Sequence, residues 1–419
     1  MNRRKLMFYY ELENKICISQ KQYPSMDEIS ENKAKESKGT IYLLHEIDPE
    51  ISRRSFSVTD PSLAFLEKEG IELLQKSESK RVYPDWLLSR IYKGDVRGIN
   101  TAYPTWENAL NYTSPQKWKI HITGMGDVGG TLVTGLRLLG GEKISEIGIY
   151  DKNEHHLNRW EQEINQILSP IPDKRHPEIS ILSEDEIFDC DLFIFCISVG
   201  VPPIGKEKKD VRIAQFEGNK KIVKAYAKMA REKNFKGIFA VVSDPVDLLC
   251  KTAFLESNKD DDGSLDFKGL AADQIRGYGL GVMNARAAYY ANKDPHLNHY
   301  LKEGRAFGPH GEGLIIANSI ENYHEEWSKE LTAKAKTANL KVRSTGFKPY
   351  IAPALSSGSL SILATITGDW HYSASFMGGV FMGAKNRNTP TGIELERLAL
   401  PSSLVNKLEN TFKLLRSFL

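Results

Sequence analysis

The sequence predicts an α/β protein whose central part is a doubly wound parallel sheet. From Lys119 onward, short apolar runs alternate with stretches of helical periodicity. The run Leu192–Ile197 is apolar at every position, as expected for a strand covered by helices on both faces. A glycine-rich turn at Gly124–Gly129 connects the first such run to the first helical stretch. This alternation of strand and helix favours a doubly wound sheet.

The elements follow one another as strand, turn, helix and strand. The first helix is predicted over Asp127–Leu139, and the second strand ends at Asp151. Further predicted elements are strands at Glu178–Leu182, Asp191–Ile197 and Gly237–Ser243, and a long helix near Arg212–Lys233.

The glycine turn has the spacing of a Rossmann dinucleotide site. Gly124 permits a tight turn, Gly126 allows close approach of a pyrophosphate, and Gly129 allows the helix to pack on the strand. An ordinary strand-helix turn is the alternative. The candidate cofactor contacts of the turn are Gly124, Met125, Gly126, Asp127, Val128 and Gly129.

Asp151 lies 27 residues after Gly124, at the end of the second strand. A carboxylate there can accept hydrogen bonds from ribose hydroxyls and would repel a 2′-phosphate. The sequence therefore favours NAD over NADP.

Length and composition describe a globular protein with two or three domains. The chain has 419 residues, of which 41% are hydrophobic and 26% charged, and its net charge is +2. Nothing in this balance indicates binding to nucleic acid or to an anionic membrane.

No apolar run approaches the roughly 18 residues of a membrane helix, and Glu11 interrupts the short apolar N-terminus, so we expect a cytoplasmic protein. The cysteines, expected to be reduced core thiols and neither metal ligands nor disulfides, are Cys17, Cys190, Cys196 and Cys250.

Residues 1–115 are predicted to form a small α+β module with a linker, and they carry no chemical constellation. The expected elements are a hairpin of Lys5–Leu12 and Lys15–Ser19, a strand at Gly39–His45, a helix at Asp60–Gln75 and a linker at Tyr103–Lys117.

Residues 116–268 are assigned to the nucleotide domain and residues 269–419 to an α+β substrate domain. Between them, 258–264 is a polar insertion in which a solvated loop is favoured over a calcium site, because the later ligand spacing is missing. The second domain is expected to contain a helix carrying Arg286, helices at Ser319–Ala338 and Ala352–Thr367, a hairpin near Ser375–Leu398 and a helix from Pro401.

Three features downstream of the glycine turn could carry chemistry. Ser198–Arg212 is a loop rich in Gly, Pro and Lys that could close on a substrate. His310 could exchange a proton near neutral pH, and Arg286 could grip a carboxylate. From spacing alone, a turn histidine and a surface ion-pair arginine are the more common explanations.

Several linked motifs resemble the L-lactate/malate dehydrogenase family over residues 117–419. They are Gly124–Gly129, Asp191–Gly200, Arg212 with Asn219, Val241–Asp247, Gly277–Arg286 and Gly308–Gly311. The resemblance implies that His310 exchanges the proton, Arg286 clamps the substrate carboxylate and Arg212 polarises the carbonyl. It also implies cofactor contacts at Ser198, Val199, Gly200 and Ser243, a substrate-pocket stretch at Ala354–Ser357, and a homo-oligomer, either dimer or tetramer.

Two positions depart from the family pattern. Met283 stands where the family has the aspartate that hydrogen-bonds the catalytic histidine, and Asp244 replaces the asparagine of an Asn-Pro-Val motif. Our hypothesis is that Asp244 takes over as the acidic partner of His310. Alternatively, Asp244 meets a cationic group on an unusual substrate, or the chemistry has decayed and the site only binds.

The sequence of the loop Ser198–Arg212 bears on the substrate. Pro202, Pro203 and Ile204 stand where malate dehydrogenases carry an arginine, which argues against malate. Lysines at 206, 208 and 209 could still meet an acidic substrate, although solvated lysines are more common.

The resulting prediction is an NAD-dependent 2-hydroxy acid dehydrogenase acting on a small 2-oxo or 2-hydroxy acid. The alternatives are an NAD-binding regulatory or scaffold protein and a reductase of imines formed from a 2-oxo acid and an amine.

Overall fold

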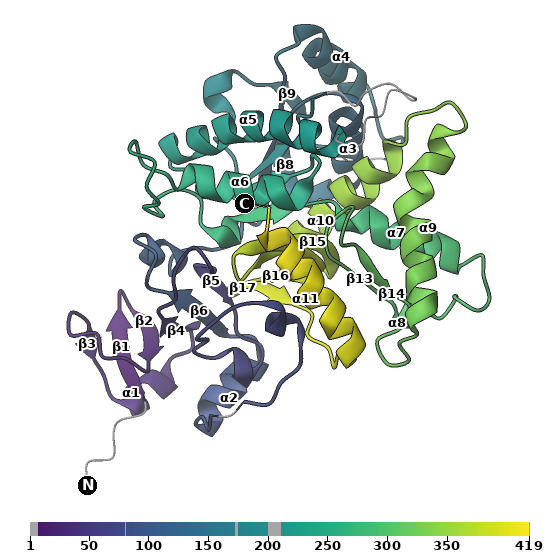
Figure 1. The fold of residues 1–419 in the computed structure, drawn as a ribbon. Coiled ribbons are helices and arrows are strands. Elements are labelled where there is room, and N and C mark those ends of the chain that lie inside the picture. Colours follow the sequence, from purple (N-terminus) through teal and green to yellow (C-terminus); the bar gives the residue numbers. More distant parts are fainter. Residues whose placement is uncertain (1–6, 80, 172–174, 200–210, 419) are drawn as a thin grey trace.

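The computed structural model describes residues 7–79, 81–171, 175–199 and 211–418, with only the backbone described for 211–214. An N-terminal module packs beside a larger body that contains the nucleotide domain and the C-terminal part of the chain (Figure 1).

The larger body is built on a nine-stranded sheet of order β17-β16-β15-β12-β11-β10-β7-β8-β9. Six neighbouring strands are parallel: β7 (Trp118–Thr123), β8 (Ile144–Tyr150), β9 (Ile179–Ile181), β10 (Leu192–Phe195), β11 (Ile238–Val241) and β12 (Ile275–Gly277). The strand order reverses between β7 and β10, which is where ligands bind in doubly wound sheets. The predicted doubly wound α/β architecture is confirmed.

Helices cover both faces of this sheet, as the apolar strands predict. Phe193 and Phe195 share a core with α5 (Val211–Glu232) and α6 (Val246–Ser257). On the other face, Ile194 packs in a core with α3 (Asp127–Leu139) and α4 (Glu154–Asn165). Alternate residues of one strand therefore belong to opposite cores.

The C-terminal part extends the sheet with three strands and adds further helices. Its elements are α7 (Leu280–Ala291), α8 (Tyr300–Glu303), β13 (Arg305–Phe307), β14 (Ile315–Ala317), α9 (Glu325–Arg343), a π-helical segment (Pro353–Ser359), α10 (Leu360–Thr367), β15 (His371–Met377), β16 (Val380–Thr389), β17 (Gly392–Leu395) and α11 (Ser402–Arg416). The helix predicted from Ser319 begins later, because His324 has extended backbone and its side chain caps the amide of Trp327.

The N-terminal module is a six-stranded sheet of order β3-β1-β2-β4-β6-β5. Its elements are β1 (Phe8–Leu12), β2 (Lys15–Ser19), β3 (Asp27–Glu28), α1 (Glu31–Glu36), β4 (Ile41–His45), β5 (Ser55–Ser57), α2 (Asp85–Tyr92) and β6 (Val96–Asn100). The predicted first hairpin and the strand ending at His45 are present. The helix predicted over Asp60–Gln75 is wrong: short 3-10 turns form at Pro61–Leu63 and Ile71–Leu74, and Phe65 between them has φ of 53°, which interrupts a right-handed helix.

The module shares its hydrophobic core with the C-terminal part. Phe56 and Leu87 of the module belong to the same buried cluster as Met382, Leu404 and Leu408. The module is therefore packed against the larger body through apolar side chains.

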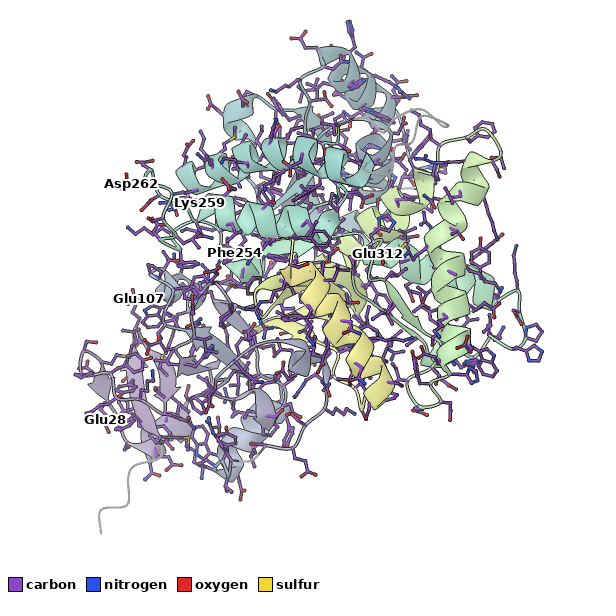
Figure 2. The ribbon with its side chains drawn as sticks, viewed as in Figure 1. Glu28, Glu107, Phe254, Lys259, Asp262 and Glu312 are labelled. Atoms are coloured by element: carbon purple, nitrogen blue, oxygen red, sulfur yellow. The ribbon has the colours of Figure 1, made fainter. Side chains whose placement is uncertain are left out.

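The polar insertion after α6 lies at the edge of the molecule, where Lys259 and Asp262 are labelled in Figure 2. The carboxylate of Asp260 accepts hydrogen bonds from the backbone amides of Asp262 (3.0 Å) and Ser264 (2.8 Å). Asp260 thus stabilises the turn of its own loop. The four cysteines are free thiols, and no helix in the described part of the chain is long and apolar enough to cross a membrane.

Candidate active site at the carboxyl edge of the parallel sheet

The glycine turn between β7 and α3 has little space for side chains. Gly124 has φ of +89°, and a Cβ on it would lie 2.8 Å from the backbone nitrogen of Ile197. A Cβ on Gly129 would lie 2.0 Å from the carbonyl oxygen of Gly124. Both glycines are therefore required for the loop to pack between β7, β10 and α3.

The same turn leaves one face open for a phosphate. A Cβ on Gly126 would meet no atom within 4 Å, and no side chain of the described residues caps the start of α3 at Gly126. Uncapped amides at a helix N-terminus can bind a pyrophosphate. The residues present thus fit a dinucleotide cofactor.

Asp151 lies beside this turn at the end of β8. Its Oδ2 accepts a hydrogen bond from the Met125 amide (2.6 Å), and its Oδ1 accepts one from the Asn153 amide (2.9 Å). Each carboxylate oxygen can accept a second hydrogen bond. Asp151 can therefore hold the turn in place and still accept hydrogen bonds from a ribose.

Two side chains near the turn were not predicted from the sequence. Lys348 donates a hydrogen bond to Asp127 Oδ2 (2.9 Å) at the first residue of α3, and its positive charge offsets that carboxylate close to the expected phosphates. The indole of Trp160 donates to the Met125 carbonyl (2.8 Å) and packs over Gly130. Neither residue has a sequence signal, since both come from elements outside the motif.

The ends of β10 and β11 are joined by a fully buried asparagine of α5. Asn219 accepts a hydrogen bond from the Val199 amide (2.8 Å) and donates to the carbonyl oxygen of Asp244 (2.6 Å). Ser243 donates to the Ile197 carbonyl (2.7 Å). Val199 and Ser243, two of the predicted cofactor contacts, are thus held at the same edge of the sheet as the glycine turn, and Ser198 lies next to Val199.

His310 and Asp244 are directly paired. His310 Nδ1 lies 3.0 Å from Asp244 Oδ1, and the exposed fractions of these side chains are 18% and 50%. Because an ionised carboxylate only accepts hydrogen bonds, this contact places a proton on Nδ1 and directs Nε2 away from Asp244. Gly279 allows the close approach of this loop, since a Cβ on it would lie 3.1 Å from the Cβ of His310.

Arg286 and Met283 lie one turn apart on α7. Met283 is buried, and Nη1 of Arg286 lies 3.4 Å from its sulfur. Burial lowers the pKa of Arg286, while the negative charge of Asp244 raises it. Arg286 therefore shares the electrostatic environment of the His310–Asp244 pair.

A second acid, Asp247, lies behind this pair in the first turn of α6. Burial raises the pKa of Asp247 to about 7, and the charges of His310 and Asp244 act on it in opposite directions. Asp247 also interacts with the backbone of Gly383, whose carbonyl accepts a hydrogen bond from the Gly308 amide (2.8 Å). No local pattern indicated Asp247, because its role depends on its interactions with His310 and with the backbone of Gly383.

Two predicted site residues cannot be placed with the others. Gly200 and the loop 200–210 lie outside the described residues, and Arg212 lies in the first turn of α5 where only the backbone is described. Ser357, from the predicted pocket stretch, donates to the Gly279 carbonyl (2.9 Å) and accepts from the Val282 amide (2.8 Å). It thereby fixes the start of α7.

The sheet order, the glycine turn and the acid after β8 define a Rossmann-type dinucleotide-binding protein. Residues 118–262 match the family model described as "lactate/malate dehydrogenase, NAD binding domain", so the cofactor is NAD. This part of the chain is thus similar to the NAD-binding domain of lactate/malate dehydrogenases.

Its relatives are distant. It is 25% identical to an L-lactate dehydrogenase of Treponema denticola over 205 residues, which are 49% of this chain and 58% of that protein. It is 24% identical to L-lactate dehydrogenase 2 of Staphylococcus aureus over 206 residues, with the same two shares. The match thus spans just over half the length of these relatives.

Solved structures show the same fold over a longer range. The lactate dehydrogenase MGS-M5 from a deep-sea metagenome library has a TM-score of 0.59 and 19% identity, covering 72% of this chain and 98% of that chain. The malate dehydrogenase of Archaeoglobus fulgidus, in complex with NADH, has a TM-score of 0.55 and 19% identity, covering 71% and 97%. The family fold therefore extends beyond the matched NAD-binding domain.

Proposed function

We propose that this protein is an NAD-dependent oxidoreductase that interconverts a 2-oxo acid and an L-2-hydroxy acid. The observation that carries the proposal is the contact of 3.0 Å between His310 Nδ1 and Asp244 Oδ1 at the carboxyl edge of the sheet. It pairs a proton-exchanging group with an acid beside a dinucleotide site.

Asp244 accepts a hydrogen bond from Nδ1–H of His310 and fixes the orientation of the ring. Nε2–H of His310 then donates a proton to the oxygen of the substrate carbonyl as that oxygen becomes an alkoxide, and Nε2 accepts the proton in the reverse direction. Bound NADH supplies the hydride that reduces the substrate. In this arrangement Asp244 performs the task of the family aspartate that Met283 replaces.

Arg286 binds the substrate carboxylate. A guanidinium binds a carboxylate through two parallel hydrogen bonds, and partial burial strengthens that interaction by excluding water. From the family resemblance, Arg212 is expected to polarise the substrate carbonyl. A dimer or tetramer in the cytoplasm is likewise expected from the family, and size-exclusion chromatography with light scattering measures the assembly.

The test is an NADH-oxidation screen over 2-oxo acids of varied size and charge, with and without added amines. We expect oxidation with at least one 2-oxo acid, without dependence on amine, and its loss in His310→Ala. NADH binding, measured by fluorescence, should remain in that variant because His310 is not part of the glycine turn.

Two other results would replace the proposal. Tight NADH binding without oxidation of any 2-oxo acid would favour the regulatory or scaffold protein. Oxidation only in the presence of an amine would favour imine reduction, in which the half-exposed carboxylate of Asp244 would hold an ammonium group.

A further inference from the structure

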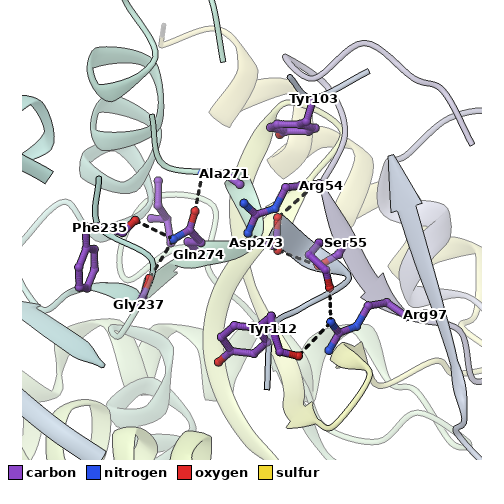
Figure 3. A network of polar contacts seen from close by, with 12 residues as sticks. Arg54, Ser55, Arg97, Tyr103, Tyr112, Phe235, Gly237, Ala271, Asp273 and Gln274 are labelled. Atoms are coloured by element: carbon purple, nitrogen blue, oxygen red, sulfur yellow. Dashed lines mark hydrogen bonds and ion pairs between the residues drawn. The ribbon is translucent and has the colours of Figure 1, made fainter. Parts of the chain in front are cut away.

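A polar cleft lies between the N-terminal module and the larger body. Figure 3 shows the polar contacts around it. The volume of the cleft is about 40 Å³. The module contributes Arg54 and Arg97, while Lys236 and Arg276 come from the segments that begin β11 and β12. The glycine turn follows the carboxyl end of β7, so the two sites lie at opposite ends of the parallel strands.

Positive charge exceeds negative charge in this cleft. Of the described residues that line it, four are cationic and Asp273 alone carries a carboxylate. The oxygens of Asp273 are already engaged, since they accept hydrogen bonds from the Arg54 amide (3.1 Å) and from Ser55 Oγ (2.9 Å). The described lining of the cleft therefore has one negative charge against four positive charges.

The buried arginines have no other acidic partner among the described residues. Arg54, Arg97 and Arg276 are only 7%, 2% and 3% exposed, and within the described chain neither Arg97 nor Arg276 forms an ion pair. Arg97 donates to the carbonyls of Ala109, Pro390 and Thr391, and Arg276 donates to the carbonyls of Asp273 and Ile275. Nε of Arg54 is buried and has no partner in the described structure.

Uncompensated buried charge is costly, and an anion in the cleft would remove that cost. Burial lowers the pKa of both Arg97 and Arg276, because the charged guanidinium loses its solvation by water. One water needs roughly 10–15 Å³ of such space, so the cleft has room for about three waters or one tetrahedral oxyanion.

We propose that this cleft binds a phosphate group, either inorganic phosphate or the phosphate of a small monoester. Arginine forks and a lysine are the side chains that recognise phosphate dianions. The module supplies two of the cations and the parallel sheet of the larger body supplies the other two, so a bound phosphate joins the module to the sheet. This site gives the module a binding role separate from the expected chemistry at His310.

The test is thermal unfolding of the full chain with saturating NADH, which fills the pyrophosphate site. Inorganic phosphate and glycerol 3-phosphate are titrated separately, with potassium chloride at matched ionic strength as the control. We expect a saturable rise in Tm of roughly 2–4 °C at a hundredfold excess over Kd. If potassium chloride raises Tm by the same amount, the proposal is overturned. It is also overturned if neither phosphate compound raises Tm.

Lys236→Glu tests the location of binding, because Lys236 is exposed and its replacement should leave the fold intact. We expect phosphate affinity to fall at least about tenfold, since one charge-assisted contact becomes repulsive. Lys233→Glu is the matched control: it lies nearby, is exposed and does not line the cleft. Equal affinities in the two variants would show that phosphate binds elsewhere. Tighter binding of the monoester than of inorganic phosphate would identify the ester as the ligand.

Discussion

His310 Nδ1 and Asp244 Oδ1 are 3.0 Å apart, although the family position for the acidic partner of this histidine is Met283. Asp244→Asn should lower kcat by roughly 10²–10⁴-fold, because an amide neither stabilises imidazolium nor enforces the tautomer with Nδ1 protonated. Met283→Ala should have a much smaller effect on kcat, since a thioether does neither. Steady-state kinetics with the best substrate measures both, and equal losses would rule out Asp244 as the partner.

Arg286→Lys tests the carboxylate clamp. A lysine keeps the charge but loses the paired hydrogen bonds, so KM for the 2-oxo acid should rise about 10–100-fold with a smaller change in kcat. Arg387→Lys is the control, because Arg387 pairs with Glu394 on the β16–β17 hairpin. A fall in kcat at unchanged KM would instead assign Arg286 to the chemical step.

Asp151→Ser tests the choice between NAD and NADP. Removing the carboxylate removes repulsion of a 2′-phosphate, so the ratio of kcat/KM for NADPH to that for NADH should rise at least about tenfold. NADH affinity should also fall, because Asp151 accepts a hydrogen bond from the Met125 amide (2.6 Å). Glu154→Gln is the control, because it removes a nearby exposed charge and leaves the glycine turn unchanged. If both variants change the ratio equally, general charge near the site sets the preference and Asp151 does not.

The sequence predicted the nucleotide domain well because its signals are local. The glycine spacing, the apolar strands and the helix Asp127–Leu139 all describe neighbouring residues, and this helix has the predicted bounds. The helix over Asp60–Gln75 failed because Phe65 adopts a left-handed backbone that local propensity does not reveal.

In the candidate site, family motifs predicted the residues, and the Met283 departure suggested the contact between His310 and Asp244 that the structure contains. Asp247 and Lys348 were missed because their importance depends on contacts across the fold: Asp247 with the loop that carries His310, and Lys348 with the start of α3. The cation cluster between the domains was missed for the same reason. Arg97 and Arg276 are far apart in sequence and meet only after the module packs on the sheet.

Asp247 makes stability depend on pH. Burial raises its pKa from 3.8 to about 7 in the folded protein. The unfolded chain therefore releases this proton at lower pH than the folded protein, so raising the pH from about 4 to about 7 favours unfolding through this group. The full effect is on the order of a few kcal/mol.

Asp247→Asn removes this titration. The free energy of unfolding of the variant, relative to that of the wild type, should therefore increase between pH 5 and pH 8, as measured by urea unfolding at several pH values. Asp262→Asn is the control, since Asp262 is exposed in the loop after α6. A constant difference between wild type and Asp247→Asn across this range would mean that Asp247 is not protonated in the folded protein.

Glu69→Gln tests how the N-terminal module is held. Glu69 pairs with Arg53 at 3.0 Å, and the two side chains are 0% and 3% exposed. Losing the carboxylate leaves Arg53 buried without a counter-charge, which costs about 3–5 kcal/mol and should lower Tm by roughly 3–6 °C. Glu67→Gln is the matched control, because Glu67 pairs with Arg81 at the surface and such pairs contribute at most about 1 kcal/mol. The carbonyl of Glu69 also lies close to Gly378 in the β15–β16 turn, so the disturbance should extend to the larger body. Equal Tm values for the two variants would show that the shared apolar core alone holds the module in place.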